Sequence, residues 1–185
     1  MRQVGIEPVT KTKFRIYLDG QFALVLYKSE LSSCHLKDGE AVTEDQIETI
    51  LSEIVLKRAK RKAMSLLQSM DRTESELRDR LLRQGFPEET VDQAVRYVKS
   101  FGYVDDRRYA ESFILSRKGR KSRREIYAEL SGKKIDGEIV DEMMERCYEE
   151  SDSGEALRHL LRKKHYDPSR ASVEEKQKLY AYLAR

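Results

Sequence analysis

The chain has 185 residues, of which 37% are charged and 39% hydrophobic, with 36 Lys and Arg against 33 Asp and Glu. A typical globular domain carries about 25% charged residues. This excess of charge, with only 3 Pro and 9 Gly, therefore favours solvated helices over a barrel or sandwich. The sequence contains no apolar run long enough to cross a membrane, no apolar signal segment, and two cysteines that make no disulfide framework. We expect a cytoplasmic protein with reduced thiols and no membrane contact.

Residues 13–27 are predicted to form a β-hairpin. Apolar residues alternate with polar ones on both sides of Asp19-Gly20. This dipeptide is a strong hairpin signal because both turn positions adopt positive φ. An isolated hairpin is only marginally stable, so we expect its apolar face to pack on the helix that follows. A short helix is predicted over residues 29–37, before Asp38-Gly39.

From Thr43 onward the chain is predicted to be helical. Several helix starts are marked by capping boxes, in which a Ser or Thr and a Glu or Gln three residues later satisfy each other's backbone N–H. The boxes begin at Thr43, Thr73, Ser122 and Ser172. The Thr73 helix is expected to stop at Gly85. A second helix begins at Phe86-Pro87 and ends at Gly102, and a third is capped by Asp105 or Asp106. Tyr103 is expected to pack between adjacent repeats.

The Ser122 box repeats the Thr73 box at an offset of 49 residues, and apolar positions recur at the same offset. The matched pairs are Leu77 with Ile126, Leu81 with Leu130, Phe86 with Ile135, Val91 with Val140, Val95 with Met144, and Val98 with Cys147. Such a period is typical of arrays of helical units. The predicted domains are a hairpin-and-helix extension (1–58), two three-helix repeats (59–106 and 107–153) and an incomplete third repeat (154–185). Leu179 and Leu183 form the apolar stripe of the last helix.

Charge is segregated along the repeats although the net charge is only +3. Residues 107–134 hold ten bases and three acids, residues 135–155 one base and nine acids, and residues 156–185 eight bases and three acids. The corresponding charges are +7, −8 and +5. Blocks of one sign raise the local potential far above what the net charge implies, and this alternation favours a partner that has both acidic and basic faces.

Several motifs together resemble the RecX family. They are the stretch TESELRDRLLRQGF from Thr73 to Phe86, GYVDDRRYA from Gly102 to Ala110, REIYAEL from Arg124 to Leu130 with Lys134-Ile135 after it, and the final residues EKQKLYAYLAR. The likeness covers roughly residues 59–185, with the third repeat ending before its usual third helix. Structural roles are expected for the family-motif residues Gly85, Phe86, Gly102, Tyr103, Asp105 and Asp106.

The resemblance implies a mainly α protein of tandem three-helix repeats in an elongated, curved array, preceded by a small β-hairpin and helix. It also implies a bacterial regulator, chiefly an inhibitor, of the RecA recombinase. Such a protein binds in the groove of the filament that RecA forms on single-stranded DNA, and so modulates recombination, DNA repair and the SOS response. The implied partners are that filament and the DNA within it, with the regulator acting as a monomer.

The candidate contacts with the filament are basic residues at helix junctions, where a helix N-terminus or neighbouring cations favour phosphate. They are Arg117, Lys118, Arg120, Lys121, Arg123, Arg124, Lys133, Lys134, Arg162, Lys163 and Lys164. A plainer interpretation is that these bases form a solvated face balanced by the acidic helix that follows. For the five bases within residues 57–62 this plainer interpretation is favoured.

Other interpretations remain open from the residues alone. The three-helix units are also compatible with an autonomous DNA-binding protein built of helix-turn-helix-like modules, or with an adaptor that contacts no nucleic acid. No catalytic, metal or phosphate-loop motif is present, so we expect no enzymatic activity, no metal and no cofactor. Core packing is the expected role of Tyr97, Tyr103, Tyr109, Tyr127 and Tyr148, with base stacking open for one or two of them.

Overall fold

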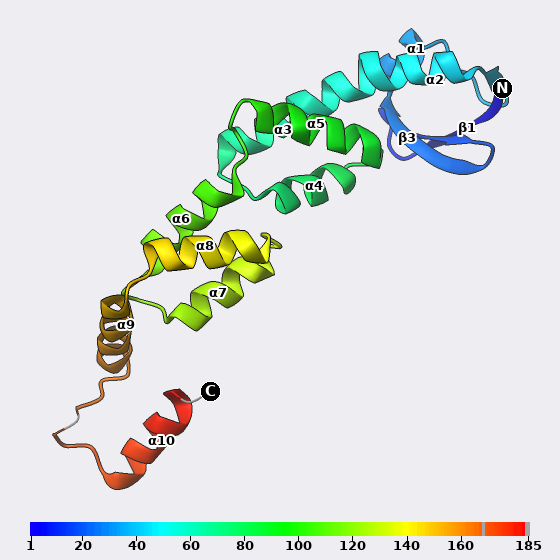
Figure 1. Cartoon of the computed structure of the whole chain (residues 1–185). Coiled ribbons are helices and arrows are strands. Elements are labelled where there is room, and N and C mark those ends of the chain that lie inside the picture. The colour runs from blue at the N-terminus through cyan, green and yellow to red at the C-terminus, as the bar shows by residue number, and fades with distance from the viewer. Residues whose placement is uncertain (168, 184–185) are drawn as a thin grey trace. The chain divides into compact units, whose positions relative to one another are not determined.

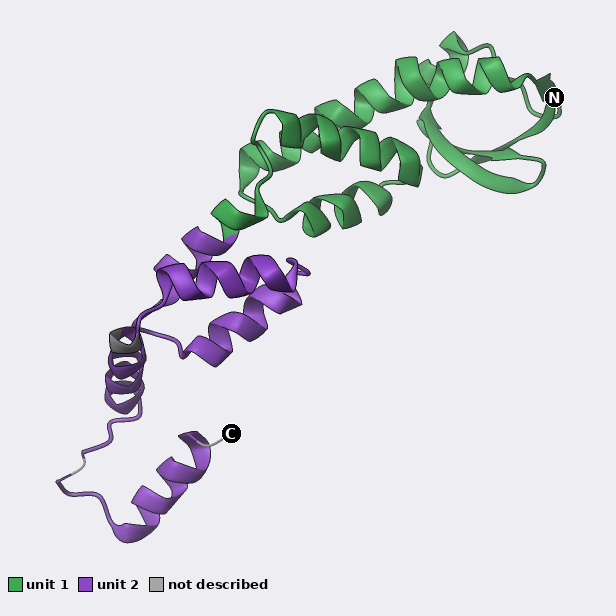
Figure 2. Ribbon diagram, viewed as in Figure 1, with its two compact units in different colours: residues 1–109 green, residues 110–185 purple. Residues whose placement is uncertain are grey.

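The computed structural model describes residues 1–167 and 169–183, and it divides into two compact units, residues 1–109 and 110–185 (Figure 2). The first unit begins with a four-stranded antiparallel sheet in the order β3-β2-β1-β4. Its strands are β1 (Arg2–Pro8), β2 (Lys13–Leu18), β3 (Gln21–Tyr27) and β4 (Ala41–Val42). The predicted hairpin is confirmed as β2–β3, with positive φ of 51° at Asp19 and 78° at Gly20.

Strands β1 and β4, which extend the hairpin into a sheet, were not predicted from the sequence. The alternation in β1 is short and contains Gly5, and β4 has only two residues, paired with Arg2 and Gln3. The helix predicted over residues 29–37 is the shorter α1 (Lys28–Ser33). It ends early because the backbone turns left-handed at His35, where φ is 54°.

A long helical segment follows the sheet and covers one of its faces (Figure 1). It comprises α2 (Glu44–Ile50), a π-helical segment η1 (Leu51–Leu56) and α3 (Lys57–Ser69). The capping box at Thr43 is confirmed, because its hydroxyl accepts the N–H of Gln46 at 3.2 Å. Side chains from the sheet and from this segment are buried together, among them Ile16, Leu26 and Val55. The hairpin face is therefore covered by the following helix, as predicted.

The same core continues into the first three-helix unit, formed by α3, α4 (Glu74–Leu82) and α5 (Glu88–Ser100). Leu77, Leu81 and Val91 are fully buried there, in one cluster with the side chains of the sheet. Burying each such side chain contributes about 1.5–3 kcal/mol. Because the cluster is shared, the N-terminal sheet and the first three-helix unit stabilise each other.

The second unit contains the end of α6 (Asp106–Arg117) and the helices α7 (Arg123–Gly132), α8 (Gly137–Cys147), α9 (Glu150–Lys163) and α10 (Val173–Leu183). The capping boxes at Thr73, Ser122 and Ser172 are confirmed. So is the 49-residue repeat, because every residue of the six matched pairs is at most 8% exposed. The chain is therefore mainly helical, with repeated three-helix units after a small sheet.

The two aspartates before α6 have different partners. Asp105 caps α6, because its Oδ1 accepts the N–H groups of Arg107 at 2.9 Å and Arg108 at 3.1 Å. Asp106 instead accepts the N–H of Glu74 at 2.9 Å, in the first turn of α4. Burial raises the pKa of Asp106. The two residues together fix the start of α6 and its contact with α4.

The last helix departs from the prediction for an apolar stripe. Leu179 is only half-buried, Leu183 is 43% exposed and Tyr180 is 72% exposed. No residue of α10 between Val173 and Leu183 is buried. Residues 184–185, which end the predicted third repeat, lie outside the described residues.

Replacing Gly85 by Ala is expected to destabilise the fold more than replacing Gly102 by Ala. Both glycines have positive φ, 84° and 69°, so either Ala costs about 1–2 kcal/mol for the left-handed backbone. A Cβ on Gly85 also lies 2.7 Å from Cγ2 of buried Val25, whereas one on Gly102 meets nothing within 4 Å. Urea unfolding of both variants measures the difference. Equal losses of stability in the two variants would contradict this prediction, because the close approach of the new Cβ to Val25 would then not lower the free energy of unfolding.

Candidate nucleic-acid interface

The densest group of sequence-predicted contact residues lies where α6 ends and α7 begins. We call residues 117–124 the basic junction. Gly119, with φ of 74°, forms the turn, and Ser122 caps α7 by accepting the N–H of Glu125 at 3.3 Å. Hydrogen bonds from the backbone N–H and hydroxyl of Ser122 lower the pKa of the Glu125 carboxyl, so this residue stays ionised.

Half of the cations in the basic junction are neutralised within the second unit. Arg117 Nε lies 3.3 Å from Glu129 Oε2, and Lys121 pairs with the same carboxylate. Lys118 Nζ lies 3.5 Å from Oδ2 of Asp152, whose residue is only 8% exposed. The plainer interpretation, a balanced charged face, therefore accounts for these three residues. Their acidic partners come from α7 and α9.

The basic junction is held in place by the region where α8 ends and α9 begins. The Tyr148 hydroxyl donates to the carbonyl oxygen of Lys121 at 3.2 Å. A Cβ on Gly119 would lie 2.7 Å from Glu155 Oε2, so the turn passes close to α9. These contacts, with the pair between Lys118 and Asp152, give the turn a defined geometry.

The remaining cations, Arg120, Arg123 and Arg124, are exposed and form no ion pair within the described part of the chain. Arg123 and Arg124 occupy the first turn of α7, where the helix dipole disfavours cations. The equivalent positions of α4 hold Glu74 and Ser75. These arginines therefore do not serve helix stability. With the helix N-terminus they form a surface suited to phosphate.

The other candidate cations lie apart from the basic junction. Lys133 and Lys134 follow the far end of α7, about 15 Å along its axis. Both take part in interactions there. Lys134 has a positive φ of 57° and stands at the repeat position of Gly85, so it also serves as the residue that ends a helix.

The cations at the end of α9 form a separate group. Arg162 and Lys163 are exposed in its last turn, where cations complement the helix dipole. Lys164 Nζ lies 4.2 Å from the centre of the Tyr182 ring. Since α9 contacts the basic junction through its first turns, this group is roughly 15 Å away along the helix.

The bases within residues 57–62 make contacts that favour the structural interpretation. Arg58 forms an ion pair with Glu30 and donates to the carbonyl oxygen of Val25 at 2.6 Å. Lys57 pairs with Glu53 at 2.6 Å. Lys60 Nζ lies 4.5 Å from the centre of the Tyr97 ring.

The prediction that the repeat tyrosines are core residues is right for Tyr148 and wrong for Tyr97, Tyr103 and Tyr127. Tyr148 is 6% exposed, whereas the other three are 38–47% exposed. Tyr103 stacks on exposed Phe101 at a centroid distance of 5.9 Å, rather than being buried between repeats. Tyr97 lies beside the buried stripe of α5 and not on it.

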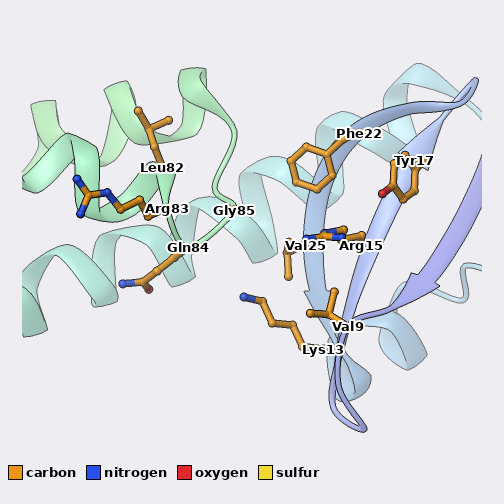
Figure 3. Close-up of a pocket in the computed structure, with 10 residues that line it drawn as sticks. All are labelled: Val9, Lys13, Arg15, Tyr17, Phe22, Val25, Leu82, Arg83, Gln84 and Gly85. Carbon is orange, nitrogen blue, oxygen red and sulfur yellow. The ribbon is translucent and has the colours of Figure 1, made fainter.

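One feature of the first unit, a cleft, was not predicted from the sequence. A cleft of about 410 Å³ lies between the β2–β3 hairpin and the end of α4 (Figure 3). Its walls come from segments more than fifty residues apart, and no local pattern brings such segments together. Within residues 1–167 and 169–183 there is no group of side chains that could hold a metal ion. In the same described part, no helix is long and apolar enough to cross a membrane.

Comparison with known proteins gives consistent matches over nearly the whole chain. Residues 59–97 match the family model for the first three-helix domain of RecX, and residues 105–144 match that for the second. Regulatory protein RecX of Caldanaerobacter subterraneus subsp. tengcongensis is 31% identical over 173 residues, covering 93% of this chain and 85% of that protein. The Clostridium tetani protein of the same name is 26% identical, covering 99% of this chain and 84% of its own length.

Solved structures share the fold. A crystal structure of regulatory protein RecX aligns with a TM-score of 0.64 and 23% identity, covering 100% of this chain and 93% of that one. The structure of RecX from Lactobacillus salivarius aligns with a TM-score of 0.58 and 22% identity, covering 67% of this chain and 81% of that one. At these identities the likeness concerns the arrangement of helices and strands.

Proposed function

Because the chain belongs to the RecX family, we propose that it is a non-enzymatic regulator of the RecA recombinase. It binds in the groove of the RecA filament on single-stranded DNA and lowers the activity of that filament. Recombination, DNA repair and the SOS response are the processes that such binding regulates. The observation that carries this proposal is the set of unpaired arginines at the basic junction, beside an acidic helix in the same unit.

The arginines supply the contact with DNA. Arg120, Arg123 and Arg124 are exposed cations whose charge no carboxylate of the described chain neutralises. Each neutralises a phosphate of the strand and releases counterions. For three contacts with a single strand, the slope of log affinity against log salt is about −2.

The acidic helix supplies a contact of the opposite sign. On α8, Glu138, Asp141 and Glu145 are all exposed. These carboxylates repel phosphate and attract basic protein surfaces. A nucleoprotein filament presents both kinds of surface, whereas naked DNA presents only phosphates. The charge pattern of this unit therefore fits the filament better than DNA alone.

Co-sedimentation tests the proposal with three partners at one salt concentration: the RecA filament on a single-stranded oligonucleotide, the oligonucleotide alone, and RecA alone. We expect affinity for the filament to exceed that for either component by at least about tenfold, because only the filament satisfies both charge blocks. Equal binding to naked DNA, with a steep salt slope, would support an autonomous DNA-binding protein. Binding to RecA alone as tightly as to the filament would support an adaptor.

A further inference from the structure

The cleft in the first unit lies between the sheet and the first three-helix unit, the two parts that share the core. Strands β2 and β3 form one wall, and the end of α4 with the turn after it forms the other (Figure 3). Its lining residues are Val9, Lys13, Arg15, Tyr17, Phe22, Val25, Leu82, Arg83, Gln84 and Gly85. Because Gly85 has no Cβ, the turn approaches buried Val25 closely and closes the floor of the cleft.

The lining of the cleft is basic. It contains three cations and no carboxylate. Within the described residues Lys13 and Arg83 form no ion pair, and Arg15 has only the exposed pair with Glu7, at 3.7 Å. Figure 3 shows the Lys13 amine extending from the sheet toward the turn, with Arg83 at the opposite rim and its guanidinium directed away from the sheet. An anionic partner therefore meets the Lys13 amine within the cleft, and the Arg83 guanidinium lies on the outer side of the opposite rim.

The lining also contains apolar side chains that are exposed to solvent. Phe22 is 49% exposed, Val9 is 43% exposed and Leu82 is 39% exposed. Single exposed apolar side chains are ordinary, but several gathered in one concave site indicate a binding surface. The Phe22 ring is held in an edge-to-face contact with Tyr17 at a centroid distance of 6.1 Å. The Tyr17 hydroxyl is fixed in turn by donating to Glu7 at 2.7 Å.

We propose that this cleft docks an acidic peptide segment of a partner protein, with a Leu or Phe side chain between Asp or Glu residues. The apolar side chain lies against Phe22, Val9 and Leu82, and the flanking carboxylates pair with Lys13 and the arginines. Two of the three exposed apolar side chains in the lining, Val9 and Leu82, are aliphatic. This favours a peptide over bases, since base binding relies on exposed aromatic faces. The cleft lies within residues 1–109, so this proposal does not rest on the function proposed for the basic junction.

Titrating the ¹⁵N-labelled full chain with the peptide Glu-Asp-Leu-Phe-Asp-Glu tests the proposal by NMR. We expect amide shifts concentrated at Lys13, Phe22 and Gly85. The double variant Lys13→Glu/Arg83→Glu is expected to bind about tenfold more weakly. Its fold should persist, because among the described residues neither side chain has an ion pair to lose. Lys11→Glu, an exposed site outside the lining, is the matched control and should change affinity less than about twofold.

Three further ligands separate the outcomes. The peptide Gln-Asn-Leu-Phe-Asn-Gln tests the charge, Glu-Asp-Ser-Ser-Asp-Glu tests the apolar anchor, and hexathymidine tests nucleic acid. The proposal requires all three to bind more weakly than the first peptide. It is overturned if hexathymidine shifts the same amides as strongly, if either altered peptide binds equally well, or if no shifts occur at the cleft. Filament binding by the Lys13→Glu/Arg83→Glu variant is measured as well. If it is retained while peptide binding is lost, the cleft and the proposed regulation of RecA are shown to be independent.

Discussion

Replacing Arg120, Arg123 and Arg124 together by Glu is expected to lower affinity for the RecA filament by about a hundredfold. Each replacement removes a cation that faces phosphate and adds a charge that repels it. The fold should survive, because none of the three side chains has an ion pair to lose in the described part of the chain. In the first turn of α7, glutamates are moreover favoured by the helix dipole. Fluorescence anisotropy on a labelled filament measures the affinity, and circular dichroism the helix content.

A matched variant distinguishes a local contact from an effect of net charge. Lys11, Lys28 and Arg96 are also exposed cations without an ion pair in the described structure, and they lie in the first unit. Replacing these three by Glu changes the net charge equally. Affinity should then fall by less than about threefold, from weakened long-range attraction alone. Equal losses in the two triple variants would contradict a specific role for the basic junction.

Replacing Arg58 by Met is expected to lower the free energy of unfolding by about 3 kcal/mol. The replacement removes the cation that neutralises the Glu30 carboxylate at a largely buried site, and leaves that carboxylate, among the described residues, only the N–H of Tyr27 at 2.8 Å. The two side chains of this ion pair are 16% and 19% exposed. Arg58 also lies over the rings of Tyr27 and Phe86, at 4.9 and 5.1 Å from their centres. It therefore connects α3 with β3, α1 and the turn before α5. Urea or thermal unfolding measures the loss.

Arg61 provides the control for this prediction. It stands one turn further along α3 and is exposed, and its one hydrogen bond within the described residues goes to the carbonyl oxygen of Lys57 at 3.4 Å. Its replacement by Met should change stability by less than about 0.5 kcal/mol. If Arg58→Met were no more destabilising than Arg61→Met, Arg58 would not be a structural residue. The basic segment of residues 57–62 would then be open again as a contact surface.

Features with a local sequence signal were predictable. A capping box is formed by two residues three positions apart, so the boxes at Thr73 and Ser122 mark helix starts without any information from distant segments. Asp19-Gly20 marks the hairpin because few other dipeptides accept positive φ at both positions. The 49-residue repeat is visible because the same core position needs an apolar side chain in each copy.

Features that depend on distant segments were not predictable. Lys118 meets Asp152 across 34 positions, so its neutralisation has no signature in the sequence. The cleft joins Lys13 to Gly85 through the fold alone. Strand β4 is too short to show alternation. Sequence therefore identified the basic junction as a candidate, and only the structure separated its three unpaired arginines from their neutralised neighbours.

The ATPase rate of RecA on single-stranded DNA is the most direct test of the regulatory role. Measured at saturating DNA with increasing amounts of this protein, the rate should fall, and the variant with Arg120, Arg123 and Arg124 replaced by Glu should require about a hundredfold more protein for the same effect. An unchanged rate, together with no co-sedimentation with the filament, would contradict the proposal that the protein regulates RecA.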